Sequence, residues 1–463
     1  MKTTAKILNG LLILFLLVSC EKDELESTDP NLLNSANSEA SENFNNGMIK
    51  SYSSDVVIQW NELLSQSIDN RLPQPAEVKI YVMVTLAMHD ALNNVVPKYE
   101  TYALDNSEVD ASDITKKNIH TIADAAVSKA ARDMMAQVFP PSTATADALL
   151  NSILSNIEDS DLKTRGIAIG QEATAAILQK RSGDFPLAFA GYPLYTEPGE
   201  YRSDFMPWAM ANPPVWPANA VYAPNLGSLT PFGIESGDQF RDQAPFPLNS
   251  ADYIKDYNEV KMLGCTSCPA RTEEQTEIGA FYIENTSSFN NRVARALIVQ
   301  KKLDGWEAAR LIGLIEMSQM DSYIASFDGK YHFNLWRPIT AVRLGDSDGI
   351  DETTGDASWT PTFTTPPTPE YPSTHSYNGG AAAAVFRAYF NTDHCDLDLI
   401  SPYNLPGTTR HLSSFSQMAR DNALSRIYIG YHFRNAIVVG ERQGGELGKY
   451  VFENNLREIK KLK

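Results

Sequence analysis

The chain has 463 residues, enough for one large domain or two small ones with cores of their own. Hydrophobic residues make up 43% of it and charged residues 21%, which is typical of a globular protein and excludes a disordered or fibrous chain. Its formal net charge of -18 repels phosphate backbones and anionic headgroups, which excludes nucleic acid, and a membrane surface bound by charge, as partners.

The first twenty residues are predicted to be an export signal. Lys2 and Lys6 precede the apolar stretch 7–18, which is too short to span a bilayer comfortably. The string LVSC ends at Cys20 and resembles a bacterial lipoprotein processing box, which implies cleavage before Cys20 and lipid attachment to its thiol. A plain signal peptide with a chance cysteine is the alternative. We therefore expect a lipid anchor at the outer membrane or cell surface of a Gram-negative bacterium, followed by a flexible tether over residues 21–50.

Residues 51–463 are predicted to form one all-α domain, a large helical bundle built as two packed bundles. Apolar residues recur there at three- and four-residue spacing, which is typical of helices that bury one face, and strand-like alternation is scarce. The segments with this spacing are Val56–Ile68, Glu77–Val95, Asp113–Gln137, Ala144–Ile157, Leu162–Gln179, Glu273–Leu303, Trp306–Ser326, Ser373–Phe390 and Ser413–Val439. Between residues 182 and 269 the spacing is lost and Pro, Gly and aromatic residues are dense. We expect this stretch to be a long ordered loop excursion over a functional site.

Three cysteines follow Cys20 in the chain. Cys265 and Cys268 form a CxxC beside Pro269, and Cys395 stands alone. A zinc or redox site would need a partner motif, and the sequence has none. The favoured interpretation of the CxxC is therefore a local disulfide in an oxidising compartment, or two free thiols.

Three further features have both a functional and a structural interpretation. Acidic residues crowd the Gly-containing loop 346–352, where calcium could bind, but they lack the spacing of a twelve-residue calcium loop and favour a solvated loop. The pair His89-Asp90 has no second set of His and Asp at metal spacing, which favours helix packing over a metal-dependent phosphohydrolase. The aromatic run 192–222 could bind an organic substrate, although packing over the bundle is favoured.

Three short segments in the last third of the chain differ from the rest in their residue types: Lys330–Pro338, Pro372–His375 and Ser425–Phe433. They combine permanent cations, imidazoles and a hydroxyl, the groups that hold a tetrahedral or bipyramidal oxyanion. The second segment precedes an Ala-rich run and should begin a helix, whose N-terminus attracts an anion through free N–H groups and positive potential. His375 would lie in the first turn of that helix.

Within the third segment, Arg426 and His432 are six residues apart. On an ideal helix this spacing leaves the two side chains about 120° out of line. Two explanations remain open: the long arginine side chain reaches round the helix, or the helix is interrupted near Gly430.

In this order the three segments resemble the signature of the superfamily that joins vanadium-dependent haloperoxidases to type 2 phosphatidic acid phosphatases. That signature is Lys, six residues and Arg-Pro; then Pro-Ser-Gly-His; then Ser-Arg, five residues and His. The first and third segments match it completely, and the second departs once, at Thr374, where the family usually has Gly. Residues 86–91 and the sequence around the first and third segments are similar to bacterial haloperoxidases. The sequence also lacks a further hydrophobic span, which argues against an integral-membrane lipid phosphatase.

The resemblance implies a helical catalytic domain with a vanadate cofactor. The residues that would bind the vanadate oxygens are Lys330, Arg337, Ser373, Thr374 and Arg426. His432 would ligate the vanadium through a ring nitrogen, and His375 would act as acid and base on hydrogen peroxide. The implied substrates are peroxide, a halide and, in some members, an organic acceptor. A β-branched residue disfavours positive φ, so Thr374 would be strained if the site needed that backbone conformation.

Two other functions are compatible with the same sequence. A soluble acid phosphatase would bind phosphate in this pocket, with His432 attacking phosphorus to form a phosphohistidine and His375 protonating the leaving group. A surface binding protein without catalytic activity could have kept the fold, but the retained His375 and His432 speak against it.

Overall fold

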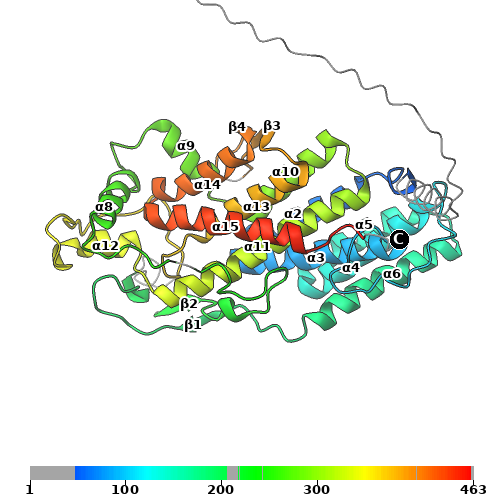
Figure 1. Cartoon of the computed structure of the whole chain (residues 1–463), viewed down its shortest axis with the longest axis horizontal. Helices are drawn as coiled ribbons and strands as arrows, with labels where there is room; N and C mark the ends of the chain where they lie inside the picture. The colour runs from blue at the N-terminus through cyan, green and yellow to red at the C-terminus, as the bar shows by residue number, and fades with distance from the viewer. Residues whose placement is uncertain (1–46, 206–216, 218, 242, 403, 460–463) are drawn as a thin grey trace, which may run out of the picture. The chain divides into compact units, whose positions relative to one another are not determined.

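The computed structural model describes residues 47–205, 217, 219–241, 243–402 and 404–459 (Figure 1). The predicted export signal, Cys20 and residues 21–46 of the predicted tether lie outside the described residues. Met48 and Ile49, near the end of the predicted tether, are buried against the helical body. Among the described residues, no helix is both long and apolar enough to cross a membrane.

The fold is all-α, as predicted, with two short hairpins added. The first half contains α2 (Asp55–Ile68), α3 (Gln74–Val95), α4 (Ile119–Val138), α5 (Thr143–Ser155) and α6 (Asp161–Lys180). The second half contains α8 (Ala251–Leu263), α9 (Glu273–Phe281), α10 (Thr286–Lys301), α11 (Gly305–Phe333), α12 (Pro338–Leu344), α13 (Thr374–Phe390), α14 (Phe415–Tyr428) and α15 (Arg434–Asn454). The hairpins pair β1 (Phe189–Gly191) with β2 (Ala220–Tyr222) and β3 (His394–Ile400) with β4 (Thr409–Ser414), both antiparallel.

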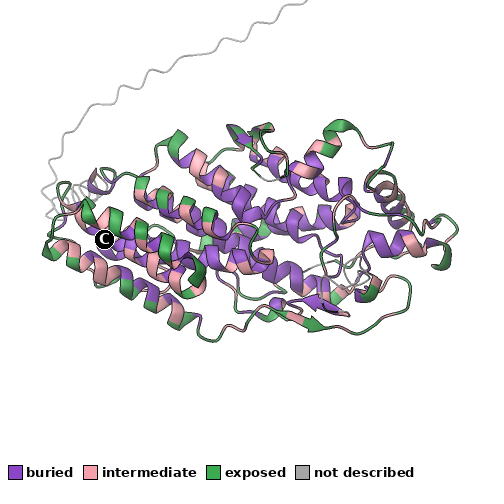
Figure 2. Cartoon of the chain, turned by 180° about the vertical axis from the view of Figure 1, so that it is seen from behind, coloured by how far each residue is buried: buried purple, intermediate pink, exposed green. Residues whose placement is uncertain are grey.

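The helices form two groups that meet at α11. In the first group α4 packs against α3 and α6, and in the second α13 packs against α14 and α15. Helix α11 contacts α3 of the first group and both α13 and α15 of the second, so its side chains are buried on nearly every face (Figures 1 and 2). A helix buried all round does not confine its apolar residues to one face, and the buried polar residues of α11, such as Glu316 and Asp321, form hydrogen bonds with neighbouring segments.

Two predicted helices were wrong because local signals interrupt them. Glu273–Leu303 is divided into α9 and α10, since the side chain of Asn285 accepts the N–H of Ser287 and begins a new helix. Ser413–Val439 is divided into α14 and α15, and Gly430 lies between them with a φ of 81°. A left-handed residue ends a helix, and glycine adopts this conformation without a steric penalty.

Helix α11 is longer than the predicted Trp306–Ser326. It begins at a capping box, in which Asp304 and Glu307 each accept the backbone N–H of the other. It ends only at Asn334, which takes a left-handed conformation with a φ of 50°. The last turn therefore includes Lys330, so a helix end fixes the position of the first motif.

The predicted excursion, residues 182–269, is ordered where it is described and contains the unpredicted helix α8. Residues 199–201 lie against residues 334–336 through two backbone hydrogen bonds of 2.8 and 2.9 Å. Asp321 of α11 holds another part, because its carboxylate accepts the consecutive N–H groups of residues 232–234 at 2.6–3.0 Å. The excursion thus passes directly beside the first motif.

Glycines on one face of α15 allow it to approach α13 closely. A Cβ atom at Gly444 would lie 2.0 Å from the carbonyl oxygen of Tyr377, and one at Gly440 would lie 2.6 Å from that of Ser373. Neither distance leaves room for a larger residue. Gly440 packs against Ser373, the N-cap of α13, so this contact holds the N-terminus of α13 close to α15.

Candidate active site

The first motif spans the end of α11 and the start of α12. Lys330 lies in the last turn of α11, Asn334 turns the chain, and Arg337 follows at the N-cap of α12 with an extended backbone. Pro338 is the first residue of α12, where a missing N–H breaks no helical hydrogen bond. Lys330 and Arg337 are both buried, so the turn places two positive charges inside the protein.

The second motif forms the N-terminus of α13, as predicted. The Ser373 hydroxyl is the N-cap and accepts the N–H of Ser376 at 3.4 Å. Thr374 is the first helical residue and is not among the residues with positive φ, so the predicted strain at this position is absent. Its hydroxyl accepts a hydrogen bond from Ser326 of α11 at 2.8 Å. This bond holds the side chain that Thr374 has where the signature has Gly.

The third motif contains a helix end and a loop. Arg426 lies in the last turn of α14, and His432 follows the glycine that ends the helix. Of the two explanations for their spacing, the interrupted helix is the one in the structure. A Cβ atom at Gly430 would lie 2.5 Å from the carbonyl oxygen of Gly264, so this turn requires glycine for space as well as for φ.

The turn between α11 and α12 meets the third motif through Arg337. Its Nη1 donates to the carbonyl of Tyr431 and to Nε2 of His432, both at 3.0 Å. Its Nε and Nη2 donate to the carbonyl and hydroxyl of Thr368 at 2.8 and 3.0 Å. Lys330 donates to the carbonyls of residues 369 and 370 at 2.9 and 2.8 Å. The segment before the second motif therefore lies between the two cations of the first.

Arg426 and His375 share one partner, the backbone carbonyl of Tyr282 in the turn between α9 and α10. Arg426 Nη2 and His375 Nε2 both lie 2.7 Å from this oxygen. A carbonyl only accepts, so Nε2 of His375 carries the ring proton and Nδ1 carries the lone pair. Both side chains are buried. The structure thus brings the predicted residues of all three motifs into one buried region.

Glu370 is a residue of this region that the sequence analysis missed. Its Oε1 lies 2.9 Å from His432 Nδ1 and also accepts the N–H of Phe433 at 2.9 Å. Since Arg337 donates to Nε2 of His432, the ring proton belongs on Nδ1, which donates it to Glu370. Glu370 and His432 are far apart in sequence, and no spacing rule connects them. The available signal was a single acidic residue in a Pro- and Thr-rich stretch, two residues before Pro372.

The buried cations pay a desolvation cost that an anion would relieve. Burial, and then the positive charge of Arg337, lower the pKa of Lys330 well below its usual value, against a smaller opposing effect of Glu370. Burial lowers the pKa of Arg426 to about 10. An arginine remains charged at neutral pH even so. Among the described residues, the carboxylate that acts on Lys330 and Arg337 is that of Glu370, which leaves an excess of positive charge.

Both imidazoles are held neutral. Burial, and then the charges of Arg337, Lys330 and Arg426, lower the pKa of His432 well below its usual value. Burial, and then Arg426, have the same effect on the pKa of His375. A neutral imidazole offers a lone pair to a metal or an electrophile, which a protonated one cannot do. The arrangement therefore combines two neutral bases with fixed positive charge.

The Cys265–Cys268 pair forms a disulfide, one of the two interpretations of the CxxC. It lies in a loop that braces the third motif: Thr362 N–H reaches the carbonyls of Gly264 and Ile429, both at 3.1 Å. Arg271 donates to the carbonyls of Cys265 and Tyr428 at 2.7 and 2.9 Å. The disulfide loop thus helps to hold the turn that precedes His432.

The other polar features are used within the fold. Asp90 accepts the N–H groups of residues 102–104 at 2.7–3.0 Å, and His89 contacts the carbonyl of Glu100 at 3.0 Å, which agrees with helix packing. In the acidic loop, Asp346 accepts the N–H of Gly355 at 2.7 Å. No group of three or more His, Cys, Asp or Glu side chains that could hold a metal ion occurs in the described part of the chain.

Comparison with known proteins identifies relatives with the same architecture. A family model described as the VCPO second helical-bundle domain matches residues 310–461, which include all three motifs. A protein named vanadium chloroperoxidase from Curvularia inaequalis is 23% identical over 83% of this chain and 79% of its own length.

Solved structures show the same fold over most of the chain. A bacterial vanadium-dependent iodoperoxidase superimposes with a TM-score of 0.68 and 22% identity, covering 88% of this chain and 99% of its own. A bacterial vanadium-dependent chloroperoxidase in its apo form gives a TM-score of 0.66 and 17% identity, covering 84% and 95%. The chain therefore shares the fold of these solved proteins over most of its length, and its part that carries the three motifs matches the VCPO second helical-bundle domain.

Proposed function

We propose that this protein is a vanadate-dependent haloperoxidase, which oxidises a halide with hydrogen peroxide to a hypohalous species. The observation that carries the proposal is the buried excess of positive charge beside an imidazole whose Nε2 is unprotonated. The family match and the fold shared with proteins named chloroperoxidase and iodoperoxidase support it. The small-molecule substrates are then peroxide, a halide and an organic acceptor where one is used.

The residues present fit vanadate. Lys330 retains a third N–H beyond the two that it donates to carbonyls, and Arg337 retains one at Nη2 beyond the four hydrogen bonds described above. Arg426 donates through Nε and one N–H of Nη2, which leaves its Nη1 side for an oxyanion. Nε2 of His432 is the kind of nitrogen ligand that a transition metal binds. Ser373 and the N–H of Thr374, at the start of α13, would bind oxygens of the same group. When bound, vanadate would supply a Lewis acid that activates peroxide for attack by halide.

His375 is the proposed acid and base. With Nε2–H donated to the Tyr282 carbonyl, Nδ1 is left to take up a proton. Burial and the neighbouring Arg426 keep the pKa of His375 low, so the ring is neutral before it takes up that proton. The same hydrogen bond fixes the ring orientation, which limits the reorganisation needed when the proton moves.

A soluble acid phosphatase is the second candidate, and the neutral His432 favours it as well. An imidazole with an unprotonated Nε2 beside three cations could attack a phosphate ester once its hydrogen bond from Arg337 is broken, and His375 would protonate the leaving group. Phosphate and vanadate are structural analogues, so one pocket can bind either. The named relatives favour the haloperoxidase.

A paired assay on the purified protein separates the two functions. The first arm adds orthovanadate, hydrogen peroxide and iodide or bromide, and follows halogenation of a dye. The second arm omits vanadate and follows hydrolysis of a phosphate monoester. Vanadate-dependent halogenation supports the peroxidase, and the halide series then gives its selectivity. Hydrolysis that vanadate inhibits, without halogenation, would make His432 a nucleophile.

We also propose that the protein is exported and anchored by a lipid on Cys20 at the outer membrane or cell surface of a Gram-negative bacterium. The proposal rests on the leader sequence and its resemblance to a lipoprotein box. Labelling with a radioactive fatty acid should mark the wild-type protein and not a Cys20→Ser variant. A variant that is still labelled would contradict attachment at Cys20.

A further inference from the structure

Glu370 connects the first and third motifs through its side chain and its backbone. The side chain is fully buried, and its Oε1 accepts from His432 Nδ1 and from the N–H of Phe433. Its backbone carbonyl accepts from Lys330, and its N–H donates to the carbonyl of Leu335 at 2.9 Å. One residue therefore contacts both a cation and the imidazole of the candidate site.

The contact of Nδ1 with Glu370 and the hydrogen bond from Arg337 to Nε2 both favour the same tautomer of His432. Burial raises the pKa of Glu370 to about 7. Above that pH its carboxylate only accepts hydrogen bonds, so it holds the ring proton on Nδ1 and leaves the lone pair on Nε2. The second contact of Oε1, with the backbone N–H of Phe433, fixes the carboxylate itself. Its other oxygen, Oε2, has no hydrogen-bond partner among the described residues. The orientation of the carboxylate thus depends on the imidazole and on the backbone that follows it.

We propose that Glu370 is a positioning residue for the vanadate site: it holds His432 in the Nδ1–H form and aims Nε2 at the metal. This inference rests on the proposed function, because it concerns the same site. A carboxylate that accepts the second N–H of a metal-bound histidine fixes the ring and makes the ligand nitrogen more basic, and losing it costs about 10- to 100-fold in metal affinity.

Positioning of His432 by Glu370 and the bare negative charge of Glu370 have opposite effects on vanadate binding. A negative charge beside the pocket repels any oxyanion, so a Glu370 that acted only as a charge would weaken vanadate and phosphate alike. A Glu370 that acts through His432 strengthens only the ligand that forms a bond to Nε2. Inorganic phosphate, which is held by cations and hydrogen bonds alone, is therefore a matched control for vanadate.

Glu316 of α11 provides a matched control residue. It is also fully buried, but its oxygens accept from the Ser287 hydroxyl and the Asn291 amide, both at 2.8 Å. These neutral partners lie outside the candidate site. Glu316→Gln therefore reproduces the loss of a buried carboxyl without changing His432.

The experiment measures orthovanadate and phosphate binding by equilibrium dialysis of the full-length wild-type, Glu370→Gln and Glu316→Gln proteins. We expect Glu370→Gln to weaken vanadate binding about 10- to 100-fold while phosphate binding is unchanged or tighter, and Glu316→Gln to leave both within about twofold. Equal weakening of both anions would indicate a distorted pocket, and tightening of both would indicate a charge effect alone. Either result would overturn the proposal.

The tautomer of His432 gives a second readout that needs no vanadate. With ¹⁵N-labelled histidine, the wild-type ring should show the Nδ1–H form. Because Arg337 also favours this form by donating to Nε2, the test compares Arg337→Ala with the double variant Arg337→Ala/Glu370→Ala, and only the double variant should shift toward Nε2–H. A tautomer that is the same in these two variants overturns the positioning role and leaves the cofactor assignment untouched. A wild-type protein that binds no vanadate, although its tautomer depends on Glu370, overturns the proposed function and with it the metal-directed role.

Discussion

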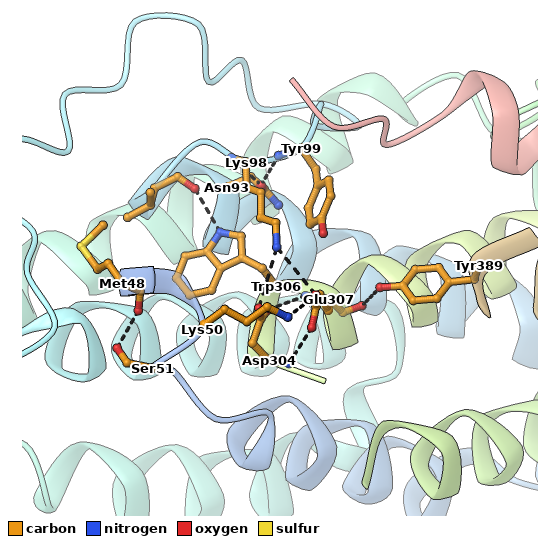
Figure 3. A network of polar contacts seen from close by, with 11 residues as sticks. Met48, Lys50, Ser51, Asn93, Lys98, Tyr99, Asp304, Trp306, Glu307 and Tyr389 are labelled. Carbon is orange, nitrogen blue, oxygen red and sulfur yellow. Dashed lines mark hydrogen bonds and ion pairs between the residues drawn. The ribbon is translucent and has the colours of Figure 1, made fainter. Parts of the chain in front are cut away.

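The two ends of helix α11 carry clusters of charged side chains that differ in their balance. At the N-terminal end, Asp304 and Glu307 face Lys50 and Lys98 (Figure 3). Lys50 bonds to Glu307 and lies 3.3 Å from Asp304 Oδ2, while Nζ of Lys98 lies 3.8 Å from the same oxygen. At the C-terminal end, Glu370 is the carboxylate among the described residues that acts on Lys330 and Arg337, the cations of the candidate site.

The difference separates a cluster whose charges are paired within the fold from one in which cations outnumber carboxylates. The acids at the N-terminal end cap the helix and lie where its dipole favours negative charge. The cations at the C-terminal end donate instead to backbone carbonyls, those of residues 369 and 370 for Lys330 and of Tyr282 for Arg426. Carbonyls satisfy the N–H groups but do not cancel the charge. An anion would complete the second cluster, whereas the first is already complete.

The largest effect is expected from removing the proposed ligand. His432→Ala should lose vanadium on dialysis and reduce halogenation to the rate without enzyme, because Nε2 is the protein atom proposed to bind the metal. Lys98→Ala, in the balanced cluster, should keep both. Metal analysis after dialysis and a dye-halogenation assay check the pair. Tightly bound vanadium in His432→Ala would remove the basis of the ligand assignment.

The next effect separates binding from chemistry within the active site. His375→Ala should retain vanadate but lower kcat about 10²- to 10⁴-fold, because it removes the group proposed to move the proton. Vanadate dialysis and steady-state halogenation kinetics measure the two effects separately. Unchanged kcat would show that His375 is not the acid and base.

Sequence patterns predicted the fold class and the grouping of the motifs better than the limits of the helices. Spacing of apolar residues located most helices, because a face buried against a neighbour leaves that pattern. The spacing failed at Asn285, because this residue caps a new helix although the apolar spacing continues across it. It also missed β3, whose alternating burial over residues 394–400 matches the alternation of its sequence, because that stretch is short.

The grouping of the motif residues could be predicted because the order and spacing of three local strings match one signature. Glu370 could not, because its role depends on a contact with His432, 62 residues later in the chain. Its carboxylate is significant only once α13 and α15 are packed together. The carbonyl of Tyr282, which joins Arg426 to His375, carries no sequence signal, since every residue has a carbonyl.

A smaller effect tests the imbalance of charge directly. Orthovanadate or phosphate at 100 times its Kd should add about 2.7 kcal/mol to the free energy of unfolding and raise Tm, since it binds the folded state alone. Glu307→Gln, in the balanced cluster, should start from a lower Tm and gain the same increment. Arg337→Ala should gain less at equal ligand concentration. Thermal unfolding with and without the anion measures the Tm of the wild type and of both variants. An unchanged wild-type Tm at saturating anion would contradict an excess of positive charge that an anion can neutralise.

A pH-dependent effect on stability is expected from Glu316, which lies between the two clusters on α11. Burial raises its pKa to about 8 from an unfolded value of 4.5, so the folded protein keeps a proton that the unfolded chain loses between these values. The free energy of unfolding of the wild type therefore falls as pH rises from about 4.5 to 8, by at most about 1.4 kcal/mol per pH unit from this group. Glu316→Gln lacks this dependence, because an amide does not titrate and can bond both Ser287 and Asn291.

Urea unfolding of both proteins between pH 5.5 and 9 measures the difference, in which all other titrating groups cancel. The stability of Glu316→Gln relative to the wild type should increase with pH up to about 8 and then level off. A difference that does not vary with pH would mean that Glu316 is ionised in the folded protein. Its charge would then need a buried positive partner, and α11 would carry a third charged cluster between the balanced one and the active site.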